Sequence, residues 1–237
     1  LEYCEQQEKR IEILEDYDQY MEELRQRMAS LEEKVKKHGK ALSVLRKKQA
    51  KVLEQAIEDG LRDLNFENVQ FAIQFAGTRD YTAEGIDEVE FMISLNPGQP
   101  LKPLANVASG GELSRIMLAI KAVMAKRDEI ETLIFDEIDV GISGRTAQKV
   151  SEKMALIGRE HQVICITHLA QIAAMADHHF MIEKATRKGE TRTEIRKLDE
   201  QESVTELARI LGGAKITDTV LKSAVEMKEL ARQTQQI

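Results

Sequence analysis

The 237-residue chain contains no tryptophan, and aromatic residues make up only 4% of it, whereas 32% of its residues are charged. This balance does not suit a uniform globule and favours a long solvated helix joined to a compact α/β unit. No run approaches the ~18 apolar residues of a membrane span, so we expect no membrane segment and interpret the protein as soluble and intracellular. With two cysteines, Cys4 and Cys165, in different parts of the chain, neither a disulfide framework nor a cysteine metal site is expected.

A phosphate-binding loop is also missing. None of the 13 glycines begins the pattern Gly-x-x-x-x-Gly-Lys-Ser/Thr of the P-loop. In P-loop nucleotide sites, the backbone and the lysine of this loop supply most of the phosphate affinity. We therefore expect the chain alone to bind ATP poorly or not at all.

The charges are unevenly distributed. The net charge of −7 argues against a nucleic-acid partner, yet eight basic residues and no acidic residue lie between Lys34 and Lys51. Two interpretations stay open. In the first, the run contacts DNA phosphates without reading sequence, through Lys36, Lys37, Lys47 and Lys48. In the second, the run is a solvated face of a coil paired with an acidic partner helix.

The first part of the sequence has the apolar spacing of a coiled coil. The spacing alternates between three and four residues, through Leu14, Tyr17, Met21, Leu24, Met28, Leu31, Val35, His38, Leu42 and Leu45. A seam of this kind needs a partner helix, so residues 1–58 are predicted to be a coiled-coil arm. The alternative is a long surface helix on a globular core.

Beyond Gly60 the pattern becomes that of an α/β fold. Residues 69–75 and 89–95 alternate with period two and predict a hairpin-like pair of strands. Further strands are expected at 133–136, 163–166, 180–183 and 192–198, and helices at 109–124, 143–157, from about 169, at 201–211 and at 217–233. Because strands alternate with helices, we expect residues 59–237 to form an α/β domain with a largely parallel sheet.

Three short segments carry candidate chemistry. Asp136 and Glu137 end the apolar run 133–135, where an aspartate can hold Mg²⁺ and a glutamate can orient or deprotonate a water. Ser109 is placed to cap a helix with Glu112, and Gly110 and Gly111 would let an anion approach its N-terminus. Each segment alone has a plain alternative: a solvated turn, a capping box, or, for His168, an ordinary histidine at a strand end.

Together and in this order, the segments resemble the motifs of ABC-type ATPases. Residues 107–115 (Val-Ala-Ser-Gly-Gly-Glu-Leu-Ser-Arg) resemble the signature loop, and 133–137 (Leu-Ile-Phe-Asp-Glu) resemble Walker B with its catalytic glutamate. Ile138-Asp139 falls at the D-loop, and Ile166-Thr167-His168 resembles the switch histidine. The segments 96–104, 136–144, 167–172 and 206–213 resemble more closely still the RecN family of SMC-like bacterial DNA-repair ATPases, over roughly residues 41–237.

This resemblance implies a fold and a set of residue roles. The chain would be a descending coil helix followed by the C-terminal lobe of an ABC/SMC-type P-loop ATPase head. Asp136 would hold Mg²⁺ through water, Glu137 would act on the attacking water, and His168 would contact the γ-phosphate. Ser109, Gly110, Gly111 and Glu112 would belong to the ATP site of an opposing head, and Asp139 would lie across the same interface. For Arg115, a supporting contact and a solvated position are equally open.

The resemblance also implies partners and a cellular role. The partners would be the N-terminal half-head carrying Walker A, a second head, and DNA. The role would be ATP hydrolysis in double-strand break repair and recombination, in the bacterial cytoplasm at the nucleoid. Two alternatives remain: an ABC transporter nucleotide-binding domain, which the long coil disfavours, and a non-hydrolysing coiled-coil DNA-binding scaffold, which the retained Glu137 and His168 disfavour.

Overall fold

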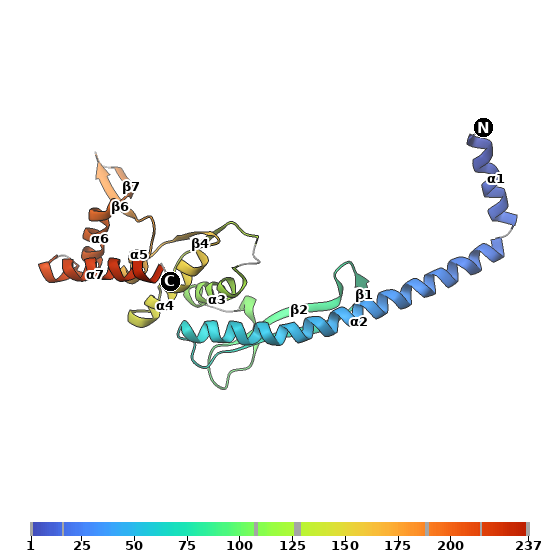
Figure 1. Ribbon diagram of the computed structural model, residues 1–237, viewed down its shortest axis with the longest axis horizontal. Helices are drawn as coiled ribbons and strands as arrows, with labels where there is room; N and C mark the ends of the chain where they lie inside the picture. The colour runs from blue at the N-terminus through green and yellow to red at the C-terminus, as the bar shows by residue number, and fades with distance from the viewer. Residues whose placement is uncertain are drawn as a thin grey trace. The chain divides into compact units, whose positions relative to one another are not determined.

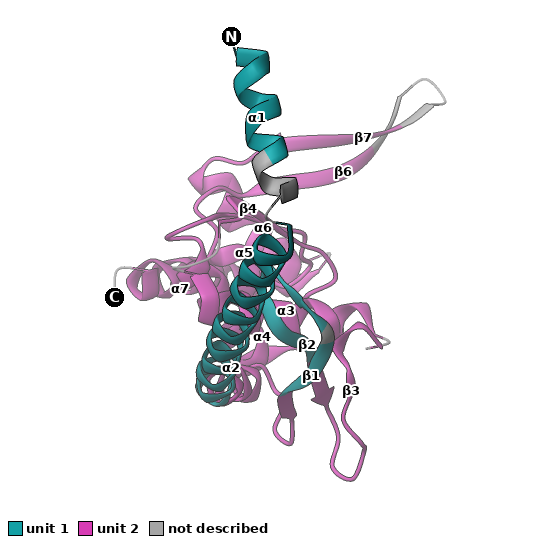
Figure 2. Ribbon diagram, turned by 90° about the vertical axis from the view of Figure 1, so that its right-hand side faces the viewer, with its two compact units in different colours: residues 1–53, 73–90 teal, residues 54–72, 91–237 magenta. Residues whose placement is uncertain are grey.

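The computed structural model describes residues 2–15, 17–106, 109–125, 129–187, 190–213 and 215–235. It divides the chain into two compact units, coloured separately in Figure 2. The arm unit comprises residues 1–53 and 73–90, and the head unit comprises residues 54–72 and 91–237. The boundary predicted at residue 58 stays a prediction, although the hairpin residues 73–90 cluster with the arm helix.

The arm unit is built from long helix and one β-hairpin (Figure 1). Helix α1 covers Glu2–Glu15, and α2 covers Tyr17–Asp63, so the predicted N-terminal helix is confirmed apart from residues 1 and 16, which lie outside the described residues. Strands β1 (Gln70–Thr82) and β2 (Gly85–Ser94) pair as neighbours, which confirms the predicted hairpin.

The hairpin packs on one face of α2. A Cβ on Gly39 would come 3.1 Å from Ile86 Cγ2, and Ser43 Oγ donates a 2.6 Å hydrogen bond to Asp87 Oδ1. Arg46 forms an ion pair with Asp87 at 3.6 Å, and Ala50 is buried. Positions 39, 43, 46 and 50 share one helix face because they are spaced four, three and four residues apart.

Most of the heptad residues lie on a different face of α2 and are exposed. Val35 and Leu45 are 44% and 55% exposed, and Leu24, Met28, Leu31 and Leu42 are exposed as well. The side chain of Leu14 lies outside the described residues. A continuous apolar stripe in water is unfavourable, which supports the expectation that a further helix packs on this seam.

The head unit begins with the last turns of α2, which pack on α3 (Gly110–Met124). Ile57 and Leu61 are fully buried, and a Cβ on Gly60 would meet Ala119 Cβ at 3.6 Å. Along the chain between α2 and α3, the head unit also contains residues 70–72 of β1 and 91–94 of β2, the short strand β3 (Lys102–Pro103) and a 3₁₀ turn at Leu104–Asn106. β3 pairs antiparallel with β2.

A βαβ unit follows in the chain. Strand β4 (Thr132–Phe135), helix α4 (Gly144–Ile157) and strand β5 (Gln162–Cys165) place the two strands in parallel. Helix α5 (Ala170–Ala174) comes next, then strands β6 (Phe180–Arg187) and β7 (Glu190–Lys197), and finally helices α6 (Glu200–Gly212) and α7 (Asp218–Gln235). The α/β class is thereby confirmed.

The expectation of a largely parallel sheet was wrong. Among the described strands, β4 and β5 pair in parallel, whereas β6 and β7 are antiparallel and β1–β2–β3 form a separate sheet. The reason is that no crossover helix joins β6 to β7, and parallel neighbours need one.

Small residues build the core of the last three helices. Ala170, Ala174, Ala208, Ala224 and Ala231 are all buried and lie in one cluster with Leu207 and Met175. Alanine lets helix axes approach closely, so α7 is fixed against α5, the helix that follows His168 in the chain. None of the described helices is long and apolar enough to cross a membrane.

Candidate active site

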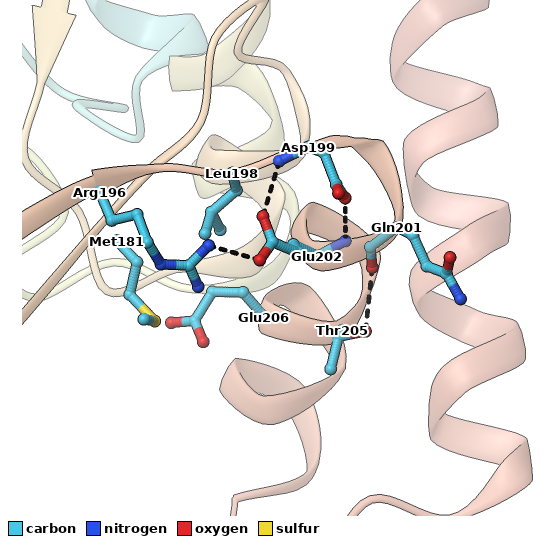
Figure 3. A pocket seen from close by; sticks show the side chains of 8 residues that line it. All are labelled: Met181, Arg196, Leu198, Asp199, Gln201, Glu202, Thr205 and Glu206. Atoms are coloured by element: carbon cyan, nitrogen blue, oxygen red, sulfur yellow. Dashed lines mark hydrogen bonds and ion pairs between the residues drawn. The ribbon is translucent and has the colours of Figure 1, made fainter.

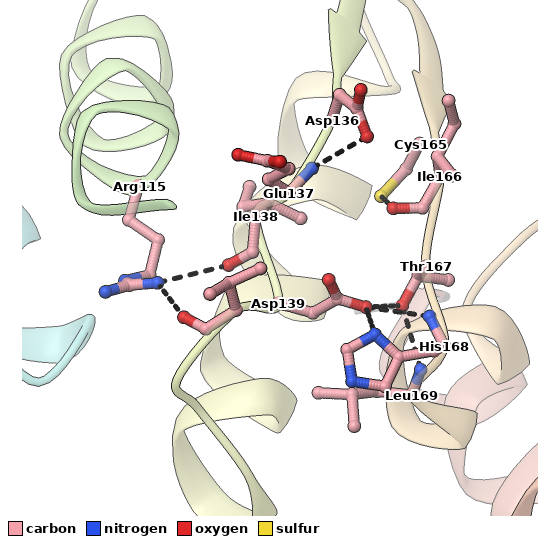
Figure 4. A network of polar contacts seen from close by, with 11 residues as sticks. Arg115, Asp136, Glu137, Ile138, Asp139, Cys165, Ile166, Thr167, His168 and Leu169 are labelled. Atoms are coloured by element: carbon pink, nitrogen blue, oxygen red, sulfur yellow. Dashed lines mark hydrogen bonds and ion pairs between the residues drawn. The ribbon is translucent and has the colours of Figure 1, made fainter. Parts of the chain in front are cut away.

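The carboxyl ends of β4 and β5 lie side by side, and a candidate motif follows each end. The strands pair from Thr132 opposite Gln162 to Phe135 opposite Cys165. The acidic pair 136–137 and the pair Thr167–His168 therefore leave the sheet at the same edge (Figure 4). Ligands of open α/β sheets bind at this kind of edge.

The two carboxylates at the end of β4 differ in their surroundings. Asp136 is exposed, its Oδ1 accepts from the Glu137 backbone N–H at 2.9 Å, and its carbonyl accepts from Ser114 Oγ at 2.9 Å. Glu137 is also exposed, but its φ of 57° lies in the left-handed region. A residue with a Cβ pays about 1–3 kcal/mol for such a conformation, which is typical of functional sites.

Glycines let the start of α3 approach this turn closely. A Cβ on Gly110 would stand 2.7 Å from Glu137 Oε2, and one on Gly111 would stand 3.0 Å from the Glu137 carbonyl oxygen. Ser109 caps the helix, as predicted, by accepting from the Glu112 N–H at 3.5 Å. Val107 and Ala108 of the resemblance lie outside the described residues.

Asp139 is turned into the head unit and binds the loop after β5. It is 3% exposed, and its Oδ2 accepts from Thr167 Oγ1 at 2.6 Å and from the His168 N–H at 2.8 Å. His168 Nδ1 lies 3.0 Å from the same oxygen, while 71% of the His168 side chain is exposed. The family resemblance implies a place for Asp139 at the interface with an opposing head, which stays a prediction; within its own chain, Asp139 contacts Thr167 and His168.

Arg115 connects α3 to the turn after β4. Only 8% of the residue is exposed, its guanidinium donates to the carbonyls of Val140 (2.8 Å) and Ile138 (3.4 Å), and it lies 5.5 Å from the Phe66 ring centre. Burial lowers the pKa of Arg115, partly offset by the charge of Glu112. Of the two possibilities left by the sequence, the structure places Arg115 in a buried supporting contact.

Cys165 lies next to these acidic groups. Burial, with a smaller effect of the negative charges of Asp139 and Asp136, raises the pKa of its thiol from 9.0 to about 12. With this raised pKa, Cys165 is expected to remain a neutral thiol. Because the thiolate is the reactive form, we expect the Cys165 thiol to be unreactive.

These residues fit one side of a nucleotide site. Among the described residues, no cluster of three or more His, Cys, Asp or Glu side chains could enclose a metal ion. Mg²⁺ in phosphate sites is usually held by one or two carboxylates together with waters and phosphates, so Asp136 alone is compatible with it. The lysine-bearing loop for the phosphates is missing from this sequence.

The four candidate DNA-binding lysines are exposed on α2 in the arm unit. Successive residues of a helix are rotated by about 100°. Lys36 and Lys47 therefore lie roughly 60° around the helix from the hairpin face (39, 43, 46, 50) and roughly 160° from the seam (38, 42, 45). Lys37 and Lys48 follow them by one residue. Lys47 Nζ lies 5.8 Å from the Phe75 ring centre.

A separate hollow of about 430 Å³ lies away from all predicted site residues (Figure 3). Several of its polar groups are paired: Arg196 with Glu202, Asp199 with Glu202 in the capping box of α6, and Glu206 with Arg209. These pairs belong to the packing of β6, β7 and α6. This capping box was not among the predictions from the sequence, although Asp199 and Glu202 have its spacing.

Comparison with known proteins gives clear relatives, although no family model matches the chain. DNA repair protein RecN of Halalkalibacterium halodurans is 39% identical over 235 residues, which are 98% of this chain and 42% of that protein. RecN of Bacillus subtilis is 38% identical over 252 residues, covering 100% of this chain and 43% of that protein. This chain thus spans about two fifths of the length of these relatives.

A solved structure, the Smc head domain with an extended coiled coil from Pyrococcus furiosus, aligns with a TM-score of 0.47 and 21% identity. That alignment covers 70% of this chain and 39% of the other. The relationship to the curated sequences is the stronger of the two.

Proposed function

Because the chain belongs to the RecN family of DNA repair proteins, we propose that it is the C-terminal half of an SMC-like ATPase head acting in DNA repair. The observation that carries this proposal is the parallel pairing of β4 with β5. It brings Asp136, Glu137 and His168 to one edge, and α3 packs against the same turn through Gly110 and Gly111.

One face of the β4–β5 sheet is apolar and exposed, which is an argument that a second half of the head packs on it. Ile134, Ile164 and Ile166 alternate with inward-facing residues and are 67%, 44% and 49% exposed. Parallel sheets in proteins are normally covered on both faces. We propose that the N-terminal half of the head, with its phosphate-binding loop, covers this face and completes the site.

Each side chain then has a defined task. Asp136 holds Mg²⁺ through water, Glu137 orients or deprotonates the attacking water, and His168 donates to a γ-phosphate oxygen. Mg²⁺, when bound, neutralises charge on the phosphates. Ser109, Gly110 and Gly111, at the N-terminus of α3, meet the γ-phosphate of ATP bound to an opposing head, so hydrolysis requires two heads to close.

DNA is the proposed partner of the arm. Lys36 and Lys47 lie on a different side of α2 from the apolar seam, which favours phosphate contact over pairing with an acidic coil partner. Contact of this kind is independent of sequence and strongly dependent on salt.

Complementation tests the proposal. We would add the N-terminal half-head in trans and measure phosphate release from ATP, expecting turnover by the mixture and none by either half. Ile164→Glu should abolish complementation, whereas Leu230→Glu on α7, which replaces a side chain that is 62% exposed, should not. ATP binding by the mixture without turnover would favour the non-hydrolysing scaffold, and robust turnover by this chain alone would contradict the split head.

A further inference from the structure

The Asp139 carboxylate is buried and makes three contacts through one oxygen. Oδ2 accepts from Thr167 Oγ1 at 2.6 Å and from the His168 N–H at 2.8 Å, and lies 3.0 Å from His168 Nδ1 (Figure 4). Burying a carboxylate is unfavourable unless hydrogen-bond donors compensate for the lost water. Both hydrogen-bond donors and the neighbouring ring nitrogen come from the loop after β5, so the carboxylate holds that loop.

The ring contact determines how His168 presents its second nitrogen. A carboxylate oxygen can only accept hydrogen bonds, so the 3.0 Å approach of Nδ1 to Asp139 Oδ2 favours the ring form in which Nδ1 carries a hydrogen. Nε2 is left on the outward part of a side chain that is 71% exposed. The backbone contact of the same residue restricts where the ring can stand.

We propose that Asp139 is a positioning residue for His168. It holds the ring with Nδ1–H turned inward and Nε2 turned outward, and its negative charge stabilises the imidazolium whose Nε2–H donates to a phosphate oxygen. The same division of labour operates where a buried aspartate orients a catalytic histidine. The phosphate contact rests on the proposed function, whereas the orientation of the ring does not.

An isosteric substitution separates this role from support of the loop. Asparagine in place of Asp139 still offers an oxygen to Thr167 and to the His168 N–H, but it carries no charge. Thr167→Val tests support of the loop, because it removes the hydrogen bond to Asp139 and the one that Thr167 Oγ1 accepts from the Leu169 N–H, and leaves the contact of Asp139 with the ring.

The orientation is tested without nucleotide. Ring ¹⁵N and ¹H shifts of this chain, with His168→Gln used to assign the signals, report which nitrogen of the neutral ring is protonated. We expect the Nδ1–H form in the unsubstituted chain and in Thr167→Val, and the Nε2–H form favoured by free imidazole in Asp139→Ala. Finding Nε2–H in the unsubstituted chain overturns the proposal, whatever the variants do.

Turnover is tested in a full-length protein that carries both half-heads. Asp139→Asn should lower kcat by about tenfold or more with KM changed less than about twofold, and Thr167→Val, which loosens the loop but keeps the charge of Asp139, should lower kcat by clearly less. In a His168→Ala background, Asp139→Asn should lower kcat by less than about twofold further, because its effect passes through the ring. Equal effects in both backgrounds overturn the positioning role. A full-length parent without turnover contradicts the proposed function, and the ring measurement still decides the orientation.

Discussion

The carboxylate of Glu137 occupies the space beside Gly110 where any other residue would carry its Cβ, since a Cβ built there stands 2.7 Å from Glu137 Oε2. This carboxylate is therefore held near the N-terminus of α3, where the helix dipole favours negative charge. Gly111 has a different neighbour, the Glu137 carbonyl oxygen at 3.0 Å, which belongs to the backbone.

Alanine at these two glycines should have unequal effects. Gly110→Ala should change the free energy of unfolding by less than about 1 kcal/mol, because the end of the Glu137 side chain can move, whereas Gly111→Ala should cost about 1–3 kcal/mol. Urea denaturation measures both. In a Glu137→Ala background the effect of Gly110→Ala should become neutral or stabilising, and that of Gly111→Ala should persist. The reverse ranking would show that the close approach is not as described.

Substitutions of Glu137 should separate stability from turnover. Glu137→Gly relieves the left-handed backbone, so its melting temperature should equal or exceed that of the parent. Glu137→Gln retains the strain and should melt within about 2 °C of the parent. In the full-length protein both should bind ATP and stop hydrolysing it. Near-normal turnover by Glu137→Gln would show that another group acts on the water.

Arg115 should matter for stability through its two carbonyl partners. Arg115→Met leaves the carbonyls of Ile138 and Val140 without their donor and should lower the free energy of unfolding by about 2–4 kcal/mol. Arg115→Lys should recover less than half of this loss, since an ammonium cannot reproduce the planar fork. Arg145→Met on α4, which replaces an exposed arginine, is the matched control and should change little. If Arg115→Met left the free energy of unfolding unchanged, the buried guanidinium would make no net contribution to stability.

Reversing charge in the basic run should weaken DNA binding. Replacing Lys36, Lys37, Lys47 and Lys48 with glutamate should lower affinity at low salt and flatten the slope of log affinity against log salt by roughly 0.9 per lost phosphate contact on duplex DNA. The matched control reverses four other cations of the arm helices: Lys9, Arg10, Arg25 and Arg27. Circular dichroism should show both variants folded. Equal losses in the two variants would point to bulk charge rather than to this run.

The two thiols should react very differently. Cys4 is exposed and should be modified by Ellman's reagent at pH 8, whereas Cys165 should react only on unfolding. The pKa of the Cys165 thiol is raised from 9.0 to about 12 in the fold. Its contribution to stability is thus complete below pH 9 and is lost as the pH rises toward 12. Cys165→Ala should flatten the alkaline fall in stability over this range, and an unchanged profile would argue against the shift.

Much of the architecture could be predicted because it depends on local patterns. The heptad spacing indicated the long helix, alternation indicated the β1–β2 hairpin, and Ser109 with Glu112 indicated the start of α3. Asp136, Glu137 and His168 could be grouped because strands joined by a helix end at the same edge of a sheet.

The remaining features depend on contacts that no local pattern specifies. The Arg115 side chain finds carbonyls more than twenty residues away, and their position follows from the turn geometry. Asp139 turns inward because Thr167 and the His168 N–H offer donors there, and no local pattern in the sequence indicates this contact. The antiparallel pairing of β6 with β7 follows from their short connection. The alternation of strands and helices elsewhere in the chain favoured a parallel sheet instead.

The parallel pair β4–β5 has one further consequence, for handling the molecule. In a two-stranded sheet both strands are edges, and each presents backbone N–H and C=O groups that can pair with another chain. Here those edges adjoin the exposed side chains of Ile134 and Ile164. Concentrated preparations of the chain by itself should consequently aggregate by strand addition, and co-expression with a segment that covers these strands should keep it in solution.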